Sequence, residues 1–339
     1  MSTQTLIIIN KMPLFFRGFN LYGQVPLSES LVDEFREVFA GQVVEKMWFT
    51  HSLGLFKTKE KLKVYGMEIN ESQLDLLIKD KQIKHLALND QRIIMLLKTG
   101  QIVKIDLNGN PSMSVVSNIN LEEGEEVSRI ECGARLFVLY TTNGQFYNDV
   151  FTRLKFKNSN IVDIKCGSEH CLILDKAGNV YSFGRGSRGQ LGHGRLDDEE
   201  ELQLIEALAG LKITKISTGF WHSCAISECG DLYTWGWNGN GQLGLIQASE
   251  RTDEVAVMAT PTLIDFPEEE NVLDVACGSK HTVVLLDNNK LYGCGWNKYK
   301  QLNNSLTEDL HSFTYLHDFT TESVSGITCG PWSTAVSSH

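Results

Sequence analysis

The sequence predicts an all-β fold, a seven-bladed β-propeller built from four-stranded blades, and three observations lead to it. A unit of about 50 residues repeats along the chain. Each clear copy carries two short apolar runs joined by a residue that tolerates a positive φ. The first and last segments of the chain each supply part of one copy. Together these features predict a single propeller domain over residues 1–339.

The repeat is clearest in three segments. They read Cys166-Gly-Ser-Glu-His170, Thr218-Gly-Phe-Trp-His222 and Cys277-Gly-Ser-Lys-His281, and their starts lie 52 and 59 residues apart. Each histidine is followed 11 residues later by a tyrosine and 20 residues later by a glutamine. Weaker copies place equivalent inner segments near residues 48, 88, 132 and 329, which gives seven blades.

A turn residue follows the inner segment of most copies by 12 positions. These residues are Gly100, Gly144, Gly178, Gly230 and Asn289. Glycine and asparagine adopt the positive φ of a tight hairpin turn more readily than other residues. The apolar runs on either side of such a turn are therefore predicted to pair as antiparallel strands. The earliest copy has Glu60 at its turn instead.

The two ends of the chain are predicted to build one blade together. The last copy begins at Cys329 and its turn would fall beyond His339. At the other end, residues 18–25 align with residues 295–302 of a complete copy. N-terminal strands would then complete the C-terminal blade and close the ring, which leaves no exposed sheet edge.

Two segments depart from the strand pattern. Ser30-Leu-Val-Asp33 resembles a capping box and predicts a short helix to about Phe39. The connection 245–271 makes its unit 7 residues longer than the preceding one, 59 against 52, and is predicted to form a projecting hairpin.

Composition limits the classes of partner. The chain carries 31 basic and 42 acidic residues, a net charge of −11, which argues against direct nucleic-acid binding through bulk electrostatics. No apolar run approaches the length of a membrane span, and no signal-peptide pattern opens the sequence. We therefore expect an intracellular protein of the nucleus or cytoplasm, a monomeric propeller without membrane contact. No Cys-x-x-Cys pair supports a zinc site.

No motif favours an enzyme. His170, His222 and His281 would lie on three different blades, so they are predicted to be structural and hydrogen-bonded within their blades. The segment 184–189 matches G-x-G-x-x-G, but strand repeats surround it and no helix follows, which predicts a blade loop. A nucleophile elbow, a Walker loop and a zinc-protease motif are all missing. The sequence predicts no catalytic residue, cofactor or metal.

The pattern C-G-x-x-H…G-x-x-Y-x-[FW]-G…G-Q-L-G resembles the regulator of chromosome condensation repeat, whose family folds as seven-bladed propellers. The clear resemblance covers Cys166–Leu302. The compact size, the absence of tails and the closing Cys329–Ser333 segment are most similar to the small single-propeller members of that family.

The resemblance implies a non-enzymatic scaffold that binds another protein. The implied partner is a Jumonji-type 2-oxoglutarate oxygenase or a histone-associated factor, with a role in chromatin. A second function stays open: a guanine-nucleotide exchange factor for a Ran-type small GTPase. Its wedge would come from the 245–271 connection, with Glu250, Asp253 and Glu254.

Candidate binding residues follow from the corners, the two residues between the Gly and His positions of each copy. Seven corners should ring one end of the propeller channel. In the last three blades they bring together Phe220, Trp221, Lys280, Pro331 and Trp332. Arg135 and Glu169 occupy corners of the third and fourth blades. Tryptophan is enriched among interface hot spots, so this sector is the predicted partner site. The alternative is that both tryptophan rings pack back onto their own blades.

Three acidic clusters are predicted to lie in connections between blades. They are Glu122–Glu126, Asp197–Glu201 and Glu268–Glu270. They are interpreted either as solvated loops or as a docking surface for a basic partner such as a histone tail.

Overall fold

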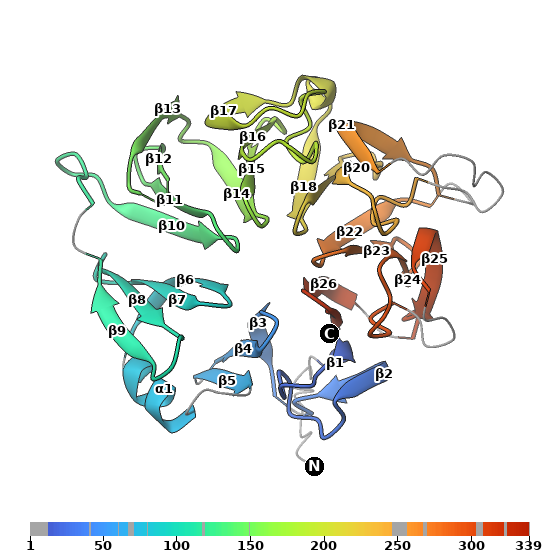
Figure 1. Cartoon of the computed structure of the whole chain (residues 1–339), viewed down its shortest axis with the longest axis horizontal. Helices are drawn as coiled ribbons and strands as arrows, with labels where there is room; N and C mark the ends of the chain where they lie inside the picture. Colours follow the sequence, from blue (N-terminus) through green and yellow to red (C-terminus); the bar gives the residue numbers. More distant parts are fainter. Residues whose placement is uncertain are drawn as a thin grey trace, which may run out of the picture.

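Seven antiparallel sheets stand around a central channel, and the chain passes through them in order (Figure 1). The computed structural model describes residues 13–40, 42–59, 61–66, 71–79, 81–116, 119–148, 150–245, 256–266, 270–302, 308–321 and 324–338. The predicted seven-bladed all-β propeller is confirmed.

Blades are numbered by the chain order of their innermost strands. Blade 1 holds β3 (Val44–Phe49), β4 (Leu53–Thr58) and β5 (Leu62–Gly66); blade 2 holds β6 (Ile83–Asn89), β7 (Arg92–Leu97), β8 (Ile102–Asp106) and β9 (Ser112–Val115). Blade 3 holds β10 (Val127–Cys132), β11 (Phe137–Thr141), β12 (Gln145–Tyr147) and β13 (Arg153–Lys157); blade 4 holds β14 (Ile161–Cys166), β15 (His170–Asp175), β16 (Val180–Gly184) and β17 (Glu199–Leu204). A short 3-10 turn, Glu206–Leu208, follows blade 4.

Blade 5 holds β18 (Ile213–Thr218), β19 (His222–Ser227), β20 (Leu232–Trp237) and β21 (Val257–Ile264). Blade 6 holds β22 (Val272–Cys277), β23 (His281–Leu286), β24 (Lys290–Gly295) and β25 (Leu310–Asp318). Blade 7 holds β26 (Val324–Gly330), β27 (Ser333–Ser338), β1 (Leu14–Phe19) and β2 (Leu31–Val38).

The first blade differs from the other six. It has three strands among the described residues, and α1 (Glu71–Ile78) follows them. Leu74 and Ile78 of this helix are buried in one core with Leu55 of blade 1 and Ile93 of blade 2. The helix therefore covers the junction between these two blades. The sequence pattern did not predict it.

The predicted hairpin turns have the expected backbone. The φ angles are 85° at Gly100, 82° at Gly144, 90° at Gly178, 88° at Gly230 and 61° at Asn289. The 12-residue spacing therefore identified each of these turns correctly. The earlier turn at Glu60 lies outside the described residues.

Ring closure by the two chain ends is confirmed. In blade 7, β1 pairs antiparallel with β27 on one side and with β2 on the other, so strands from both ends share one sheet. Residues Leu14 to Gly18 lie opposite Ser337 to Ser333. Each backbone edge of the central strands finds a partner, which is the reason that a closed ring is stable.

The predicted helix from Ser30 to about Phe39 is wrong, because Leu31–Val38 is strand β2. Its buried residues Val32 and Val38 contact the core of blade 7. As a helix, this segment would leave the outer edge of β1 without hydrogen-bond partners. Completion of the sheet therefore outweighs the local capping pattern.

Two of the three repeat histidines connect neighbouring blades. All three side chains are fully buried. His170 Nε2 lies 2.9 Å from Ser223 Oγ in blade 5, and His222 Nε2 lies 3.0 Å from Thr282 Oγ1 in blade 6. The structural role is as predicted, but the bonds at His170 and His222 run between blades and not within them. Burial lowers the pKa of His170 and of His281 to about 3, so both stay neutral.

Candidate functional site

Five of the seven corners are joined by direct backbone hydrogen bonds around one mouth of the channel. Each bond runs from an amide to the carbonyl of the next corner: Arg135 to Ser168, Ser168 to Phe220, Phe220 to Ser279 and Ser279 to Pro331, over 2.8 to 3.3 Å. Residues of all seven corners line a cavity of about 200 Å³ at this mouth. The predicted ring of corners at one end of the propeller is therefore present.

The corner of blade 1 joins that of blade 2 through side chains. His51 Nδ1 lies 2.7 Å from Asp90 Oδ2, and the His51 amide donates to Asp90 Oδ1 over 2.8 Å. Burial by itself would raise the pKa of Asp90, but the hydrogen bonds from His51 outweigh it and lower that pKa. This pair links the corners of blades 1 and 2 at the mouth of the channel.

Trp221 packs against the loop of the preceding blade. The Arg188 guanidinium carbon lies 4.1 Å from the ring centroid of Trp221 and 4.8 Å from that of Trp237. The Phe220 ring meets Trp221 edge-on at 4.8 Å. Because the arginine lies between two indoles, its charge is held in place by two cation–π contacts.

Trp332 lies in a second aromatic group. Its ring centroid is 5.2 Å from Tyr299, 5.1 Å from Phe19 and 4.4 Å from His51. Trp296 lies 5.9 Å from Trp332 and carries the Lys280 ammonium 5.6 Å above its ring. Trp332 therefore contacts the preceding blade, blade 1 and the N-terminal strand of its own blade.

These two groups of side chains stand at consecutive corners of the ring and are together named here the corner rim. Its eight members are half-buried and come from blades 4 to 7: Arg188, Phe220, Trp221, Trp237, Lys280, Trp296, Tyr299 and Trp332. Pro331 adjoins it and accepts the Ser279 amide. Arg135 and Glu169 lie further round the ring and pair with each other, with Arg135 Nη1 3.3 Å from Glu169 Oε1.

Four rim residues were absent from the sequence prediction. Trp237 and Trp296 each follow a glycine at the end of the third strand: Trp237 is the last residue of β20, and Trp296 comes directly after β24. Arg188 and Tyr299 each stand two residues before the repeat glutamine. The alignment of the repeat contained this signal. Only the fold shows that these loops lie against the corner of the next blade.

The acidic clusters differ in their positions. Glu122–Glu126 precedes blade 3, as predicted, but Asp197–Glu201 leads into β17 within blade 4, so its predicted place between blades is wrong. Several of its carboxylates are engaged locally. Asp198 pairs with Arg185, Glu199 pairs with Arg195, and Glu201 accepts the Lys155 amide over 2.8 Å. In the third cluster only Glu270 is described.

The predicted projecting hairpin lies partly outside the described residues. Residues 257–264 form β21, the outer strand of blade 5. The wedge residues Glu250, Asp253 and Glu254 fall in the undescribed segment 246–255.

The described part of the chain offers little for a metal or a membrane. It contains no group of three or more His, Cys, Asp or Glu side chains placed to hold a metal ion. It also has no helix with the length and apolarity that a membrane crossing requires. The G-x-G-x-x-G segment at 184–189 begins at the end of β16 and runs into a turn, so it is a blade loop.

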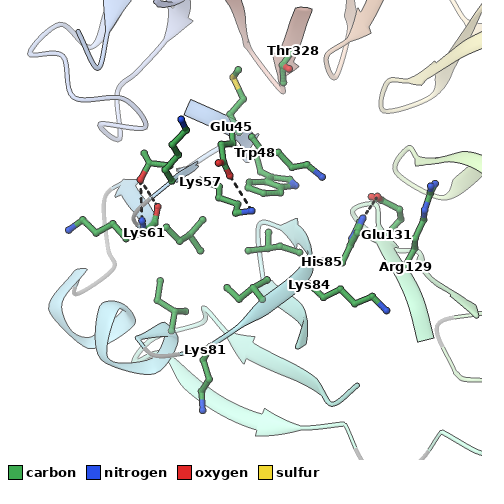
Figure 2. A pocket seen from close by; sticks show the side chains of 18 of the residues that line it. Glu45, Trp48, Lys57, Lys61, Lys81, Lys84, His85, Arg129, Glu131 and Thr328 are labelled. Carbon is green, nitrogen blue, oxygen red and sulfur yellow. Dashed lines mark hydrogen bonds and ion pairs between the residues drawn. The ribbon is translucent and has the colours of Figure 1, made fainter. Parts of the chain in front are cut away.

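Inside the channel, one carboxyl group lies in an unfavourable environment. Burial raises the pKa of Glu131 from 4.5 to about 7, although Lys165 and Arg129 oppose the shift. His85, whose Nε2 is 3.9 Å from Glu131 Oε1, has its pKa lowered to about 4 by burial (Figure 2). At neutral pH the imidazole is therefore uncharged and compensates Glu131 poorly.

Replacing Glu131 with glutamine should stabilise the protein in alkaline solution. A carboxyl group whose pKa is raised by folding makes the folded protein less stable as the pH rises from the unfolded-state pKa through the folded-state pKa. We expect Glu131→Gln to raise the free energy of unfolding by about 1–2 kcal/mol near pH 8 and to leave it unchanged near pH 4. This gain in stability is smaller than the pKa shift alone would give, because 29% of the Glu131 side chain is exposed to water in the channel. Urea unfolding at both pH values measures it, with exposed Glu126→Gln as control; equal effects of both variants would contradict it.

The repeat matches that of known proteins. Models of the regulator of chromosome condensation (RCC1) repeat match residues 177–226 and 229–285, and a second set matches 161–190, 213–242 and 272–301. Human RCC1 domain-containing protein 1 is 35% identical over 236 residues, which are 60% of this chain and 61% of that protein. The mouse protein of the same name is 37% identical over 204 residues, 51% of this chain and 54% of that protein. The matches thus span little more than half the length of these relatives.

A solved structure extends the likeness to the whole ring. Prp20p from Saccharomyces cerevisiae superposes with a TM-score of 0.76 over 97% of this chain and 92% of its own. At 16% identity, this likeness describes the fold.

Proposed function

Given that this chain carries RCC1 repeats in a closed seven-bladed ring, we propose that it is a non-enzymatic scaffold that binds another protein through the corner rim. One observation carries the proposal: four large aromatic side chains, Phe220, Trp221, Trp296 and Trp332, are only partly buried on one sector of one face. Aromatic and arginine side chains are the residue types most enriched in interface hot spots.

The rim is also well prepared for binding. Trp221 and Trp237 hold Arg188 between them, and Trp296 holds Lys280. Side chains that are already ordered lose little conformational entropy when a partner covers them. The two cations favour a partner surface that presents carboxylates beside an apolar area.

The partner that we propose is a Jumonji-type 2-oxoglutarate oxygenase, or a histone-associated factor, in the nucleus or cytoplasm. Its support is the resemblance to small single-propeller members of the repeat family, to which the matches with RCC1 domain-containing protein 1 add. The fold alone does not determine a partner, so this assignment depends on the binding experiment below.

A second candidate is exchange activity on a Ran-type GTPase. The structural study of Prp20p concerns its binding to Gsp1p and histones, and that protein shares the ring architecture. Release of a fluorescent GDP analogue from a purified Ran-type GTPase tests this candidate directly. Acceleration that disappears in a variant lacking Glu250, Asp253 and Glu254 would support exchange over scaffolding.

Trp221→Ala should weaken partner binding by about ten- to a hundredfold, because a central interface tryptophan typically contributes about 2 kcal/mol or more. The measurement is the dissociation constant, by calorimetry, for a purified Jumonji-type oxygenase. Tyr315→Ala is the matched control, since this aromatic residue of β25 is 45% exposed and lies outside the rim.

Equal affinities for the wild type and Trp221→Ala, with the melting temperature unchanged, would exclude the rim as the binding surface. Trp332→Ala is a poorer test, because the ring of Trp332 packs against Phe19 and Tyr299 and its loss should also reduce stability.

A further inference from the structure

A large cavity opens where blades 1 and 2 meet. It has a volume of about 1870 Å³ and extends from the inner strands of the channel to the β4–β5 turn and the segment before β6 (Figure 2). β3 and β6 pack less closely than any other pair of neighbouring innermost strands. The innermost strands contribute their early residues to this cavity, such as Glu45 and Ile83, and their final residues to the corner mouth. The cavity therefore belongs to the channel end opposite the corner rim.

The walls of this cavity are basic although the protein is acidic. Among the described lining residues, nine are lysine or arginine and three are aspartate or glutamate, against a net charge of −11 for the whole chain. Lysines come from separate elements: Lys59 and Lys61 from the β4–β5 turn, and Lys79, Lys81 and Lys84 from the start of blade 2. Such a concentration of one sign attracts the opposite charge.

Few of these charges are neutralised by the described part of the protein. Lys57 pairs with Glu45 at 3.2 Å, and Lys165 pairs with Asp163 at 3.3 Å. Within the described residues, the exposed Lys59, Lys61 and Lys81 form no ion pair with a carboxylate.

The excess of lysines over acidic residues also holds when the undescribed positions of these segments are counted from the sequence. Glu60 and Asp80 lie outside the described part of the structure. Counting them, residues 57–63 and 79–84 contain seven lysines and two acids. The excess of positive charge in these two segments therefore does not depend on the undescribed residues.

Apolar side chains lie between the lysines. Trp48, Leu62, Ile83 and Leu86 line the cavity, and Leu76 of α1 is 71% exposed at its margin. A compact polyphosphate would leave these apolar surfaces uncovered. The lysines also come from two separate segments, the β4–β5 turn and the start of blade 2, which suits an extended chain better than a compact ligand.

We propose that this cavity, called the groove from here on, binds an acidic peptide segment of a partner protein. The carboxylates of the peptide meet the lysines, while its apolar side chains cover Trp48 and Leu76. The peptide would lie along the opening between the β4–β5 turn and β6. This site is independent of the corner rim and of the function proposed for it.

The test uses the full chain and a fluorescein-labelled peptide of about 15 residues in which glutamate alternates with leucine and phenylalanine. Fluorescence anisotropy gives its dissociation constant. Combining Lys59→Glu, Lys61→Glu and Lys81→Glu, all at exposed positions, should weaken binding about tenfold or more. A peptide with glutamine in place of glutamate should bind similarly weakly to the wild type.

The matched control is Lys155→Glu, Lys157→Glu and Lys176→Glu, which changes the net charge equally at exposed positions of blades 3 and 4. It should alter the affinity less than about twofold. The proposal is overturned if the peptide does not bind, if both triple variants weaken binding equally, or if the glutamine peptide binds as well. Tighter binding of inositol hexakisphosphate or of a single-stranded oligonucleotide, with displacement of the peptide, would also overturn it.

Discussion

Replacing Gly219 with alanine is expected to destabilise the protein by about 3–4 kcal/mol, because the corner has no room for a methyl group. A Cβ at this position would overlap the imidazole of His222 and come within 2.6 Å of the Gly278 carbonyl oxygen. Both neighbours are fixed: His222 is fully buried and bonds Thr282 of the next blade. Relief of the overlap would therefore break a contact between blades 5 and 6. Chemical denaturation at neutral pH measures the loss.

Gly326→Ala is the matched control for this variant. Neither Gly219 nor Gly326 has a positive φ, so backbone strain does not distinguish them. A Cβ at Gly326 would meet its nearest neighbour, a carboxylate oxygen of Asp274, at 3.5 Å, an ordinary contact. We expect a change within about 0.5 kcal/mol there. Comparable losses in both variants would show that the packing of the corner is not the cause.

Phe16→Ala should destabilise the protein by about 3–5 kcal/mol through the blade that closes the ring. Phe16 is fully buried in β1, opposite Ala335 of the C-terminal strand, and its ring centroid lies 5.7 Å from that of Phe49 in blade 1. The cavity left by the ring would weaken both the sheet of blade 7 and its contact with blade 1. Hydrogen exchange should therefore show faster exchange in β1 and β27 together, before blades 3 to 5 are affected.

Leu21→Ala is the control in the same segment, since this leucine is 53% exposed. It should change the free energy of unfolding by less than about 0.5 kcal/mol. If hydrogen exchange in Phe16→Ala rises uniformly over all blades, the variant does not open the closing blade before the others, and the expected order of opening is wrong.

The candidate site could be predicted in part. The repeat register placed Phe220, Trp221, Lys280 and Trp332 on corners, because a corner has a fixed position in each unit. Their partners could not be found in the same way. Arg188 reaches Trp221 from the loop of the preceding blade, so the contact joins residues 33 positions apart. The seven lysines of the groove's two lysine-rich segments could likewise not be recognised from the net charge of the chain, which is −11.

The sequence by itself determined the ring. Turn residues such as Gly178 and Asn289 impose a local backbone conformation, and their constant spacing sets the strand lengths, the number of blades and the closure by both chain ends. Only the tertiary structure decided the rest. Ser30–Phe39 has a local pattern for a helix, yet its main part pairs with β1 because an unpaired strand edge is more unfavourable than a lost cap. The helix α1 exists where it can fill the junction of blades 1 and 2. The corner rim and the groove likewise arise where neighbouring blades meet, and a contact between blades depends on the assembled ring, not on the residues of any one repeat.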